Sequence, residues 1–225
     1  MADDPRYYHH VRAEIAPLLP AAASRIVDVG CGAGATLAWL GRRYPAAHTI
    51  GLEGNPAVAD ELRGNAREVH ILDLNRDDPD LGAPDLILFL DVLEHLPDPA
   101  ETLRRLTARL APGGTVIVSV PNVAHWSVAL PLLFRGEFTY RDKGILDRTH
   151  LRFFVQSSAL DLVSDAGLVA DRGLIAGVRG LKGRLADALT LGQLRRRLAE
   201  QFIIRAKLPD STRPGPVIWS LAEYS

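Results

Sequence analysis

The sequence has few of the features that mark several large classes of protein. Its one cysteine, Cys31, excludes an intramolecular disulfide and a cysteine-rich zinc site. Its 26 basic and 27 acidic residues give a net charge of -1, which does not suit a protein whose main ligand is nucleic acid. The longest mostly apolar run, residues 123–134, is too short to insert across a bilayer. No leader pattern follows Met1, so we expect a cytoplasmic protein.

The residues that are present are typical of a folded domain. Apolar residues make up 47% of the 225 residues and charged residues 24%, which is ordinary for a globular protein. At roughly 150 residues per domain, we expect residues 1–225 to form one large domain. The adjacent histidines His9 and His10 would face apart on a helix and could not share an ion. We therefore predict no metal site.

Short apolar segments alternate with longer amphipathic segments along the first 121 residues. The predicted strands are residues 25–30, 48–53, 68–72, 85–90 and 115–120, and the predicted helices are residues 35–43, 56–67 and 98–110. Strands that alternate with helices form a parallel sheet with helices on both faces. The sequence therefore predicts an α/β fold: a doubly wound, Rossmann-like sheet of seven strands, preceded by an N-terminal helix.

The alternation stops after Pro121. Connections in α/β units usually have roughly 2–6 residues. The much longer segment 122–155 is therefore predicted to be an inserted lid beside the ligand-binding edge of the sheet, and residues 22–121 form the half that carries this edge. Residues 156–225 should complete the sheet with a helix at 156–166, a strand at 167–175, a basic amphipathic helix at 184–205 and a strand at 216–224.

A glycine-rich turn follows the first predicted strand. Its sequence is Asp28-Val-Gly30-Cys-Gly32-Ala-Gly34, in which small residues let the backbone approach a ligand closely. Glu53, at the end of the second strand, is placed to accept hydrogen bonds from both hydroxyls of a ribose. The spacing also fits the dinucleotide fingerprint G-x-G-x-x-G/A, so these residues alone leave a nicotinamide-dependent enzyme open.

Four motifs in order distinguish between these interpretations. They are DVGCGAG from Asp28, GLEGN from Gly51, ILDLN from Ile71 and DVLEHLPDP from Asp91. Together they resemble the motifs of class I S-adenosylmethionine-dependent methyltransferases. The resemblance is to the small-molecule and glycan-cluster branch, which is related to the ubiquinone-type O-methyltransferases. The segment GILDRTHLRFF, ending at Phe154, is similar to a motif of the same branch.

The resemblance implies S-adenosylmethionine as cofactor and gives the motif residues their roles. The three glycines would pack against its methionine part, Asp28 would help to hold its ammonium group, and Glu53 would bind its ribose. Asp73 would accept from the adenine amino group, with Leu74 stacking nearby. The full set implied to bind the cofactor is Tyr8, Arg12, Asp28, Gly30, Gly32, Gly34, Glu53, Asp73, Leu74, Asp91, Val92 and His95.

The predicted lid carries the residues that would meet the methyl acceptor. A hydroxyl acceptor must lose its proton, and a histidine with a pKa near neutral suits that task. We predict His150 as the base, with His125 as the second candidate and His95 as the third. The remaining residues predicted to bind the acceptor are Trp126, Tyr140, Asp142 and Arg152.

The function predicted from the sequence is methyl transfer from S-adenosylmethionine to an oxygen or nitrogen of a small molecule. The glycan-branch resemblance makes a sugar, or a nucleotide-linked sugar, the leading acceptor. Two alternatives stay open, an NAD(P)-dependent oxidoreductase and a non-catalytic cofactor-binding partner protein. The apolar run 123–134 leaves a weaker option, a lipid-linked acceptor at a membrane surface, and an oligomer also stays open.

Overall fold

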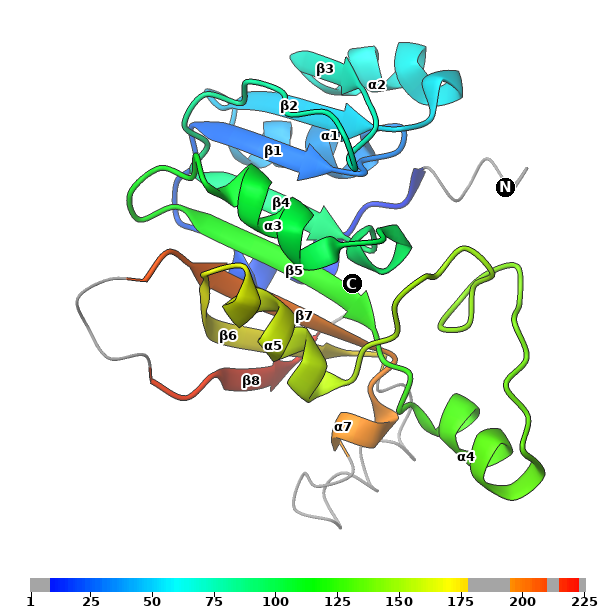
Figure 1. The fold of residues 1–225 in the computed structure, drawn as a ribbon. Helices are drawn as coiled ribbons and strands as arrows, with labels where there is room; N and C mark the ends of the chain where they lie inside the picture. Colours follow the sequence, from blue (N-terminus) through cyan, green and yellow to red (C-terminus); the bar gives the residue numbers. More distant parts are fainter. Residues whose placement is uncertain (1–8, 178–194, 210–214, 223–225) are drawn as a thin grey trace.

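The computed structural model describes residues 9–177, 195–209 and 215–222. These residues form an eight-stranded sheet in the order β3-β2-β1-β4-β5-β7-β6-β8, covered by helices on both faces (Figure 1). The strands are β1 (Arg25–Val29), β2 (His48–Glu53), β3 (Glu68–Ile71), β4 (Leu86–Leu90), β5 (Thr115–Pro121), β6 (Val169–Ala176), β7 (Gln201–Lys207) and β8 (Ile218–Leu221). The α-helices are α1 (Ala35–Arg43), α2 (Ala59–Asn65), α3 (Pro99–Thr107), α4 (Trp126–Arg135), α5 (Gln156–Asp165) and α7 (Arg195–Leu198), and the 3-10 helices are η2 (Ala13–Leu18), η3 (Pro56–Val58) and η4 (Leu93–His95).

The first five strands run parallel and set the functional edge of the sheet. β1 pairs with β2 and β4, β2 with β3, and β4 with β5, all in parallel register. The carboxyl ends of these strands therefore meet at one edge, which is where ligands bind in open α/β sheets. β7 runs antiparallel to β5 and β6, and β8 runs parallel to β6.

Strand β4 shows why the sheet forms. All five of its residues are apolar and buried, as expected of a central strand that is covered on both faces. Ile87 and Phe89 belong to the core cluster that contains side chains of α3 and α5, whereas Leu86 and Leu88 belong to the cluster that contains side chains of η2 and α1. Figure 1 shows α3 and α5 on one face of the sheet. The doubly wound class predicted from the sequence is confirmed.

Three details of the prediction are wrong. The sheet has eight strands rather than seven. The predicted N-terminal helix is only a six-residue 3-10 helix, η2, that contains Pro17. In the described part of the predicted helix 184–205, residues 195–198 are helical and Gln201–Lys207 form β7. Phe202, Ile203 and Ile204 are consecutive and fully buried, which suits a strand between β5 and β6 but not one stripe of a helix.

The segment after β5 leaves the sheet and returns to it, as predicted for residues 122–155. It contains α4, which projects away from the sheet (Figure 1). Its two ends are joined, because Asn122 bridges Phe154 and the amide of Val123 donates to the carbonyl of Phe154 at 2.9 Å. None of the helices in the described ranges has the length and apolar character needed to cross a bilayer.

Candidate active site

The glycine-rich turn lies between β1 and α1, where it was predicted. Gly30, Gly32 and Gly34 all have positive φ angles, of 69°, 56° and 81°. At Gly30 a Cβ atom would lie 2.7 Å from Cγ2 of Val92, which is too close for any side chain. Glycine is therefore required there both by its conformation and by the close approach of the loop after β4.

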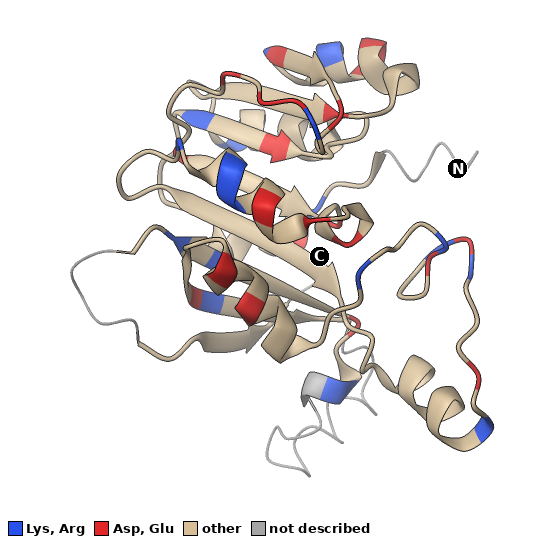
Figure 2. Ribbon diagram, viewed as in Figure 1, with Lys and Arg blue, Asp and Glu red and all other residues tan. Residues whose placement is uncertain are grey.

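Glu53 ends β2 and connects that strand to the glycine turn. Its Oε2 accepts the amide of Gly32 at 2.8 Å, and its Oε1 accepts the amide of Asn55 at 2.8 Å. The side chain is 9% exposed. Figure 2 shows acidic residues at the carboxyl ends of β1 and β2. Two backbone donors thus hold this carboxylate in one orientation, and each oxygen has a further lone pair for a ligand hydroxyl.

Asp28 lies within β1 and is 3% exposed. Burial raises the pKa of this carboxyl from its ordinary 3.8 to about 7, with Arg12 opposing the rise and Glu53 adding to it. An acidic group in these surroundings gains from a cationic ligand, because a positive charge would offset the cost of burying the carboxylate. The nearby Cys31 is held as a neutral thiol, since burial raises the pKa of its Sγ.

The buried carboxyl of Asp28 predicts a pH-dependent stability. Its folded pKa of about 7 exceeds the unfolded value near 3.8, so the folded state keeps the proton longer. Stability should therefore fall as pH rises from about 4 to about 7, by at most about 1.4 kcal/mol per pH unit. Urea unfolding of the wild type and of Asp28→Asn across this range measures the difference, and the variant should lack this part of the slope. Burial also raises the pKa of Glu94, but this residue is present in both proteins. Its contribution to the pH dependence of stability is therefore the same in each. Equal slopes in the two proteins would show that Asp28 is not held in this state.

Arg12 organises the start of the loop after β4. Its guanidinium donates to Glu14 at 2.5 Å, to Asp91 at 2.6 Å and to Gln201 at 2.8 Å. Asp91 has a φ of 57°, a conformation rarely adopted by residues other than glycine, and its Oδ1 accepts the hydroxyl of Ser119 at 2.9 Å. The sequence predicts Arg12 and Asp91 as separate cofactor contacts. The structure joins them in one ion pair, in which Arg12 is buried and Asp91 is partly exposed.

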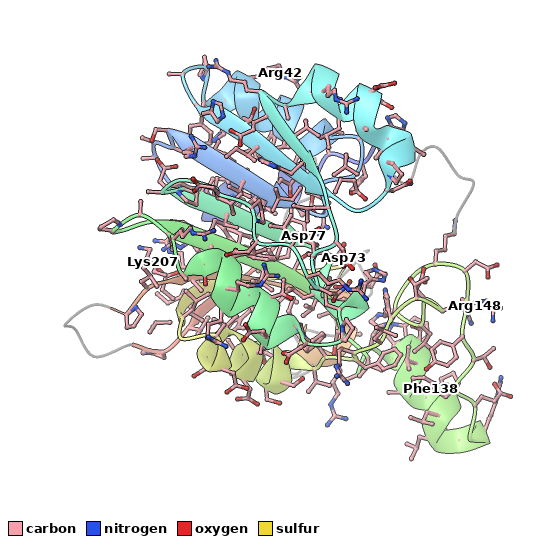
Figure 3. The ribbon with its side chains drawn as sticks, turned by 45° about the horizontal axis from the view of Figure 1, so that its top comes forward. Arg42, Asp73, Asp77, Phe138, Arg148 and Lys207 are labelled. Atoms are coloured by element: carbon pink, nitrogen blue, oxygen red, sulfur yellow. The ribbon has the colours of Figure 1, made fainter. Side chains whose placement is uncertain are left out.

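The remaining predicted cofactor residues lie around this edge. Asp73 follows β3, where the backbone of Leu72 pairs with Glu53, and its side chain is exposed (Figure 3). Hydrogen bonds from the backbone and side chain of Asn75 lower the pKa of Asp73. Leu74 and Val92 are both 8% exposed. Tyr8 lies outside the described residues.

The end of the lid segment contacts the loop after β4. The amides of Leu151 and Arg152 both donate to the carbonyl of Glu94, at 2.8 and 3.1 Å. His150 is 9% exposed, and its ring lies edge-on to that of His95 with centroids 4.7 Å apart. Burial lowers the pKa of His150, so its imidazole is neutral at pH 7. The structure therefore brings two of the three predicted histidines together beside Asp91.

The predicted acceptor residues separate into two groups. Tyr140 lies near His150, since both contact the ring of Phe153, at centroid distances of 6.2 and 6.4 Å. Asp142 is instead paired with Arg148 on the exposed side of the lid, and Arg152 donates to the carbonyl of Pro97. His125 caps α4, with its Nδ1 accepting the amide of Ser127 at 3.3 Å. Of these three side chains, only Arg152 contacts the loop after β4, and the other two make contacts within the lid.

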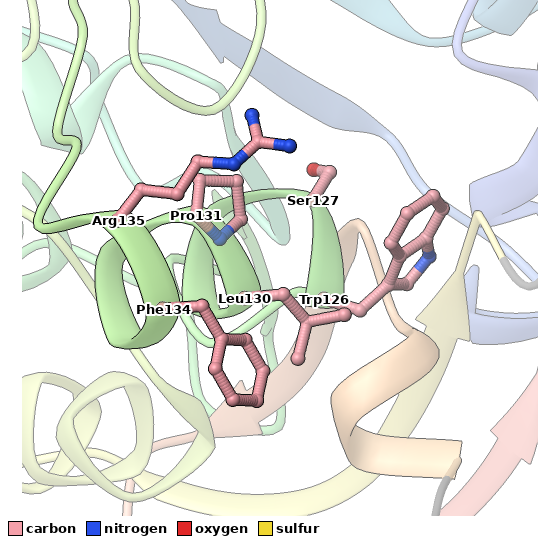
Figure 4. Close-up of a pocket in the computed structure, with 6 residues that line it drawn as sticks. All are labelled: Trp126, Ser127, Leu130, Pro131, Phe134 and Arg135. Atoms are coloured by element: carbon pink, nitrogen blue, oxygen red, sulfur yellow. The ribbon is translucent and has the colours of Figure 1, made fainter.

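Trp126 lines a pocket of about 320 Å³ on α4 (Figure 4). The other residues that line it are Ser127, Leu130, Pro131, Phe134 and Arg135. All six residues belong to this one helix, so the pocket lies on the projecting part of the lid and not among the strand ends. The contact of Trp126 with the acceptor stays a prediction.

The comparisons with known proteins agree with the geometry of this edge. A family model described as a methyltransferase domain matches residues 3–171. The chain belongs to the methyltransferase domain family. This membership confirms the predicted class, an S-adenosylmethionine-dependent methyltransferase, and with it the predicted cofactor. It also removes the ground for an NAD(P)-dependent oxidoreductase, which rested on the glycine spacing and on Glu53, features that both interpretations share.

Individual relatives match part of this methyltransferase. A trans-aconitate 2-methyltransferase of Methylobacterium radiotolerans is 38% identical over 113 residues, covering 49% of this chain and 43% of the relative. A ubiquinone biosynthesis O-methyltransferase of Marinobacter nauticus is 36% identical over 110 residues, covering 45% of each. The matches thus span less than half the length of these two relatives. A solved methyltransferase from Mesorhizobium loti shares the fold, with a TM-score of 0.59 and 17% identity over 85% of this chain and 94% of that one.

The charge on Glu53 should matter for cofactor binding by this methyltransferase. Glu53→Gln keeps the size of the side chain but loses one charged acceptor, and hydrogen bonds to charged groups contribute about 1.5–3 kcal/mol. We expect affinity for S-adenosylhomocysteine, measured by calorimetry, to fall by about 10–100-fold. Glu101→Gln, on the exposed surface of α3, is the matched control and should bind like wild type. Equal affinities for both variants would remove Glu53 from the site.

Proposed function

We propose that this methyltransferase transfers the methyl group to a hydroxyl oxygen of a small molecule, with a sugar or nucleotide-linked sugar as the leading acceptor. The observation that carries the proposal is the position of neutral His150, on the lid, beside the strand ends that bear the cofactor residues. The similarity to a ubiquinone biosynthesis O-methyltransferase supports oxygen as the acceptor atom. The glycan-branch motif GILDRTHLRFF, which contains His150, supports a sugar.

The residues at the strand ends fit S-adenosylmethionine. A Cβ at Gly30 would clash with Val92, so the turn keeps the compact glycine backbone that the family resemblance places against the methionine part of the cofactor. Asp28 is buried and would bind the ammonium group, while the carboxylate of Glu53 has lone pairs for the two ribose hydroxyls. When bound, S-adenosylmethionine would supply an electrophilic methyl group on its sulfonium, with neutral S-adenosylhomocysteine as the leaving group.

The contribution of the chain is to orient the acceptor and to accept its proton. Well-oriented reactants gain about 7–11 kcal/mol over reactants free in solution. Nδ1 of His150 lies 3.0 Å from the carbonyl of Ile145, and a carbonyl only accepts, so Nδ1 carries the hydrogen. Nε2 therefore keeps its lone pair and is the atom that takes the hydroxyl proton. Tyr140 and Phe153 give the lid aromatic faces beside it.

A panel of acceptors tests this function directly. Labelled S-adenosylmethionine would be incubated with the protein and with nucleotide sugars, free sugars, trans-aconitate, catechol-type quinols and small amines. We expect label in an alkali-stable ether on a sugar hydroxyl. Label found only in a carboxylate ester or an amine would contradict the proposed acceptor.

Calorimetry separates the acceptor from the cofactor. S-adenosylhomocysteine should bind and NAD should not. Binding without transfer to any member of the panel would leave the family assignment standing but overturn the proposed sugar acceptor. Binding of NAD alone would contradict both.

A further inference from the structure

We propose that Glu94, His95 and His150 form a binding site for one divalent transition-metal ion, with Zn²⁺ as the best match to the ligand set. Each side chain offers one ligand atom, and these three atoms lie within 4.8 Å of one another. Glu94 and His95 come from the loop after β4 and His150 from the end of the lid, so the ion would join the lid to the sheet. No residue of this set was predicted to bind a metal.

The hydrogen bonds of His150 and His95 leave the same nitrogen free on each ring. Nδ1 of His150 donates to the carbonyl of Ile145 at 3.0 Å. Nδ1 of His95 lies 3.2 Å from the carbonyl of Thr149 and 3.0 Å from its Oγ1. That hydroxyl donates its own hydrogen to Asp147 at 2.7 Å, so Nδ1 of His95 must be the donor.

Both rings are therefore Nδ1–H tautomers whose Nε2 lone pairs are available. Metal-binding histidines are usually fixed in this way, with one ring nitrogen bound to the ion and the other donating to a carbonyl or carboxylate. Asp147 and Thr149 thus act as positioning residues for His95. This gives a physical reason for Asp147, Thr149 and His150 to occur together in the segment DRTH.

Glu94 is the strongest independent sign of a missing ligand. It is 1% exposed, and its Oε2 has no hydrogen-bond partner among the described residues. A buried, unpaired carboxylate oxygen costs free energy unless a cation or a donor satisfies it. An ion bound by the two Nε2 atoms would do so.

A second cluster of similar composition shows the contrast. Glu68 lies between His48 and His70, but its Oε2 is 2.6 Å from Nε2 of His48 and its Oε1 is 2.8 Å from Nε2 of His70. Both oxygens and both Nε2 atoms are already engaged there. At Glu94 the carboxylate oxygen and the ring nitrogens are left over, which is the arrangement that an ion requires.

The ligand set and its spacing favour a zinc-like ion. Two imidazoles and one carboxylate are the protein ligands of many catalytic zinc sites, which keep a fourth position open. Zn–ligand bonds of about 2.1 Å set tetrahedral ligand separations of about 3.4 Å, so the three atoms would draw together by about an ångström on binding. If the proposed function holds, the open position of the metal-bound protein would bind the acceptor hydroxyl and lower its pKa, so that the proton leaves to solvent. Nε2 of His150 would then act as the base only in the metal-free protein.

Zinc titration of the full chain tests the site without any turnover. After removal of metal with a chelator, Zn²⁺ would be added in a calorimeter, and Co²⁺ would be added separately to record its visible absorption. We expect one ion per chain and a Co²⁺ spectrum typical of four-coordinate nitrogen and oxygen ligation. Glu94→Gln and His150→Ala should each weaken Zn²⁺ binding by at least about 10–100-fold, the loss usual for a supporting residue alone. His70→Gln, in the second cluster, is the matched control and should keep wild-type affinity.

The outcomes separate this site from simpler explanations. Absence of one-to-one binding, or equal losses in His70→Gln and Glu94→Gln, would overturn the proposal. Thermal unfolding with and without Zn²⁺ shows whether each variant is folded. Folded wild type should be stabilised by the ion, and folded Glu94→Gln should not. Zn²⁺ binding would stand even if no sugar were methylated, so the failure of one proposal can be told from the failure of the other.

Discussion

Replacing Arg12 with methionine is expected to lower the free energy of unfolding by about 3–5 kcal/mol, the usual cost of removing one partner from a buried ion pair. Arg12 is 8% exposed and bonds to both Glu14 and Asp91. Methionine would fill part of the space but would leave two carboxylates uncompensated, one of them buried. Asp91 would also lose a contact that holds its unfavourable backbone conformation. Urea unfolding at pH 7 measures the change.

Arg109→Met is the matched control for this experiment. Arg109 donates to Asp78 at 3.0 Å, but both side chains are well exposed, and such pairs contribute about 0–1 kcal/mol. Both variants replace a guanidinium group with the same methionine side chain. The difference between their losses in free energy of unfolding therefore measures the effect of burying the ion pair. A loss below 1 kcal/mol in Arg12→Met would show that Arg12 does not hold the start of the site together.

The strand ends of the site could be predicted because each depends on local sequence. β1 ends in the glycine turn and β2 ends at Glu53, and parallel strands place these ends at one edge. Asn55 directly precedes the predicted helix 56–67, and its side chain accepts the amide of Ala57 as an N-cap residue does. Neither inference needs knowledge of any residue far away in the chain.

The connections between distant segments could not be predicted in this way. Arg12 meets Gln201 across 189 positions, and no local pattern indicates that pairing. Phe202 was placed on a helix because leucines precede it at helical spacing, but its burial between two strands decides its conformation. Glu94 lies in the motif DVLEHLPDP, but only the fold shows that its Oε2 is buried without a hydrogen-bond partner among the described residues.

The lid illustrates both cases. Residues 122–155 were predicted as a lid from the length of the connection alone, and His150 was chosen from them as the base. The structure adds that His150 meets the loop after β4 while α4 projects from the sheet with an exposed apolar surface, including Leu133 and Phe134 at 73% and 76% exposure. Figure 2 shows only the C-terminal end of α4 coloured as charged, at Arg135. Within residues 122–155, the end that carries His150 thus contacts the loop after β4, whereas α4 projects away from it.

His150→Ala is expected to lower kcat by about 10²–10⁴-fold, the usual contribution of a general base. Affinity for S-adenosylhomocysteine should stay at the wild-type value, because the strand ends that we propose to bind the cofactor are untouched. Burial lowers the pKa of His150 below its ordinary 6.5. A base acts only when unprotonated, so wild-type kcat should rise with pH to a midpoint below 6.5 and then stay level. The variant should lack that rise. Turnover and calorimetry on the same preparations measure both quantities.

His125→Ala is the comparison that gives this result its meaning. His125 has a lowered pKa from burial as well, and it was the second candidate for the base. Its Nδ1, however, is held by Ser127 at the start of α4, and loss of such a cap costs roughly 1 kcal/mol of stability. We therefore expect this variant to unfold more easily and to keep turnover close to wild type. If His125→Ala loses turnover and His150→Ala keeps it, the base belongs to α4, and the lid must close over the strand ends in a way that brings that helix to the cofactor.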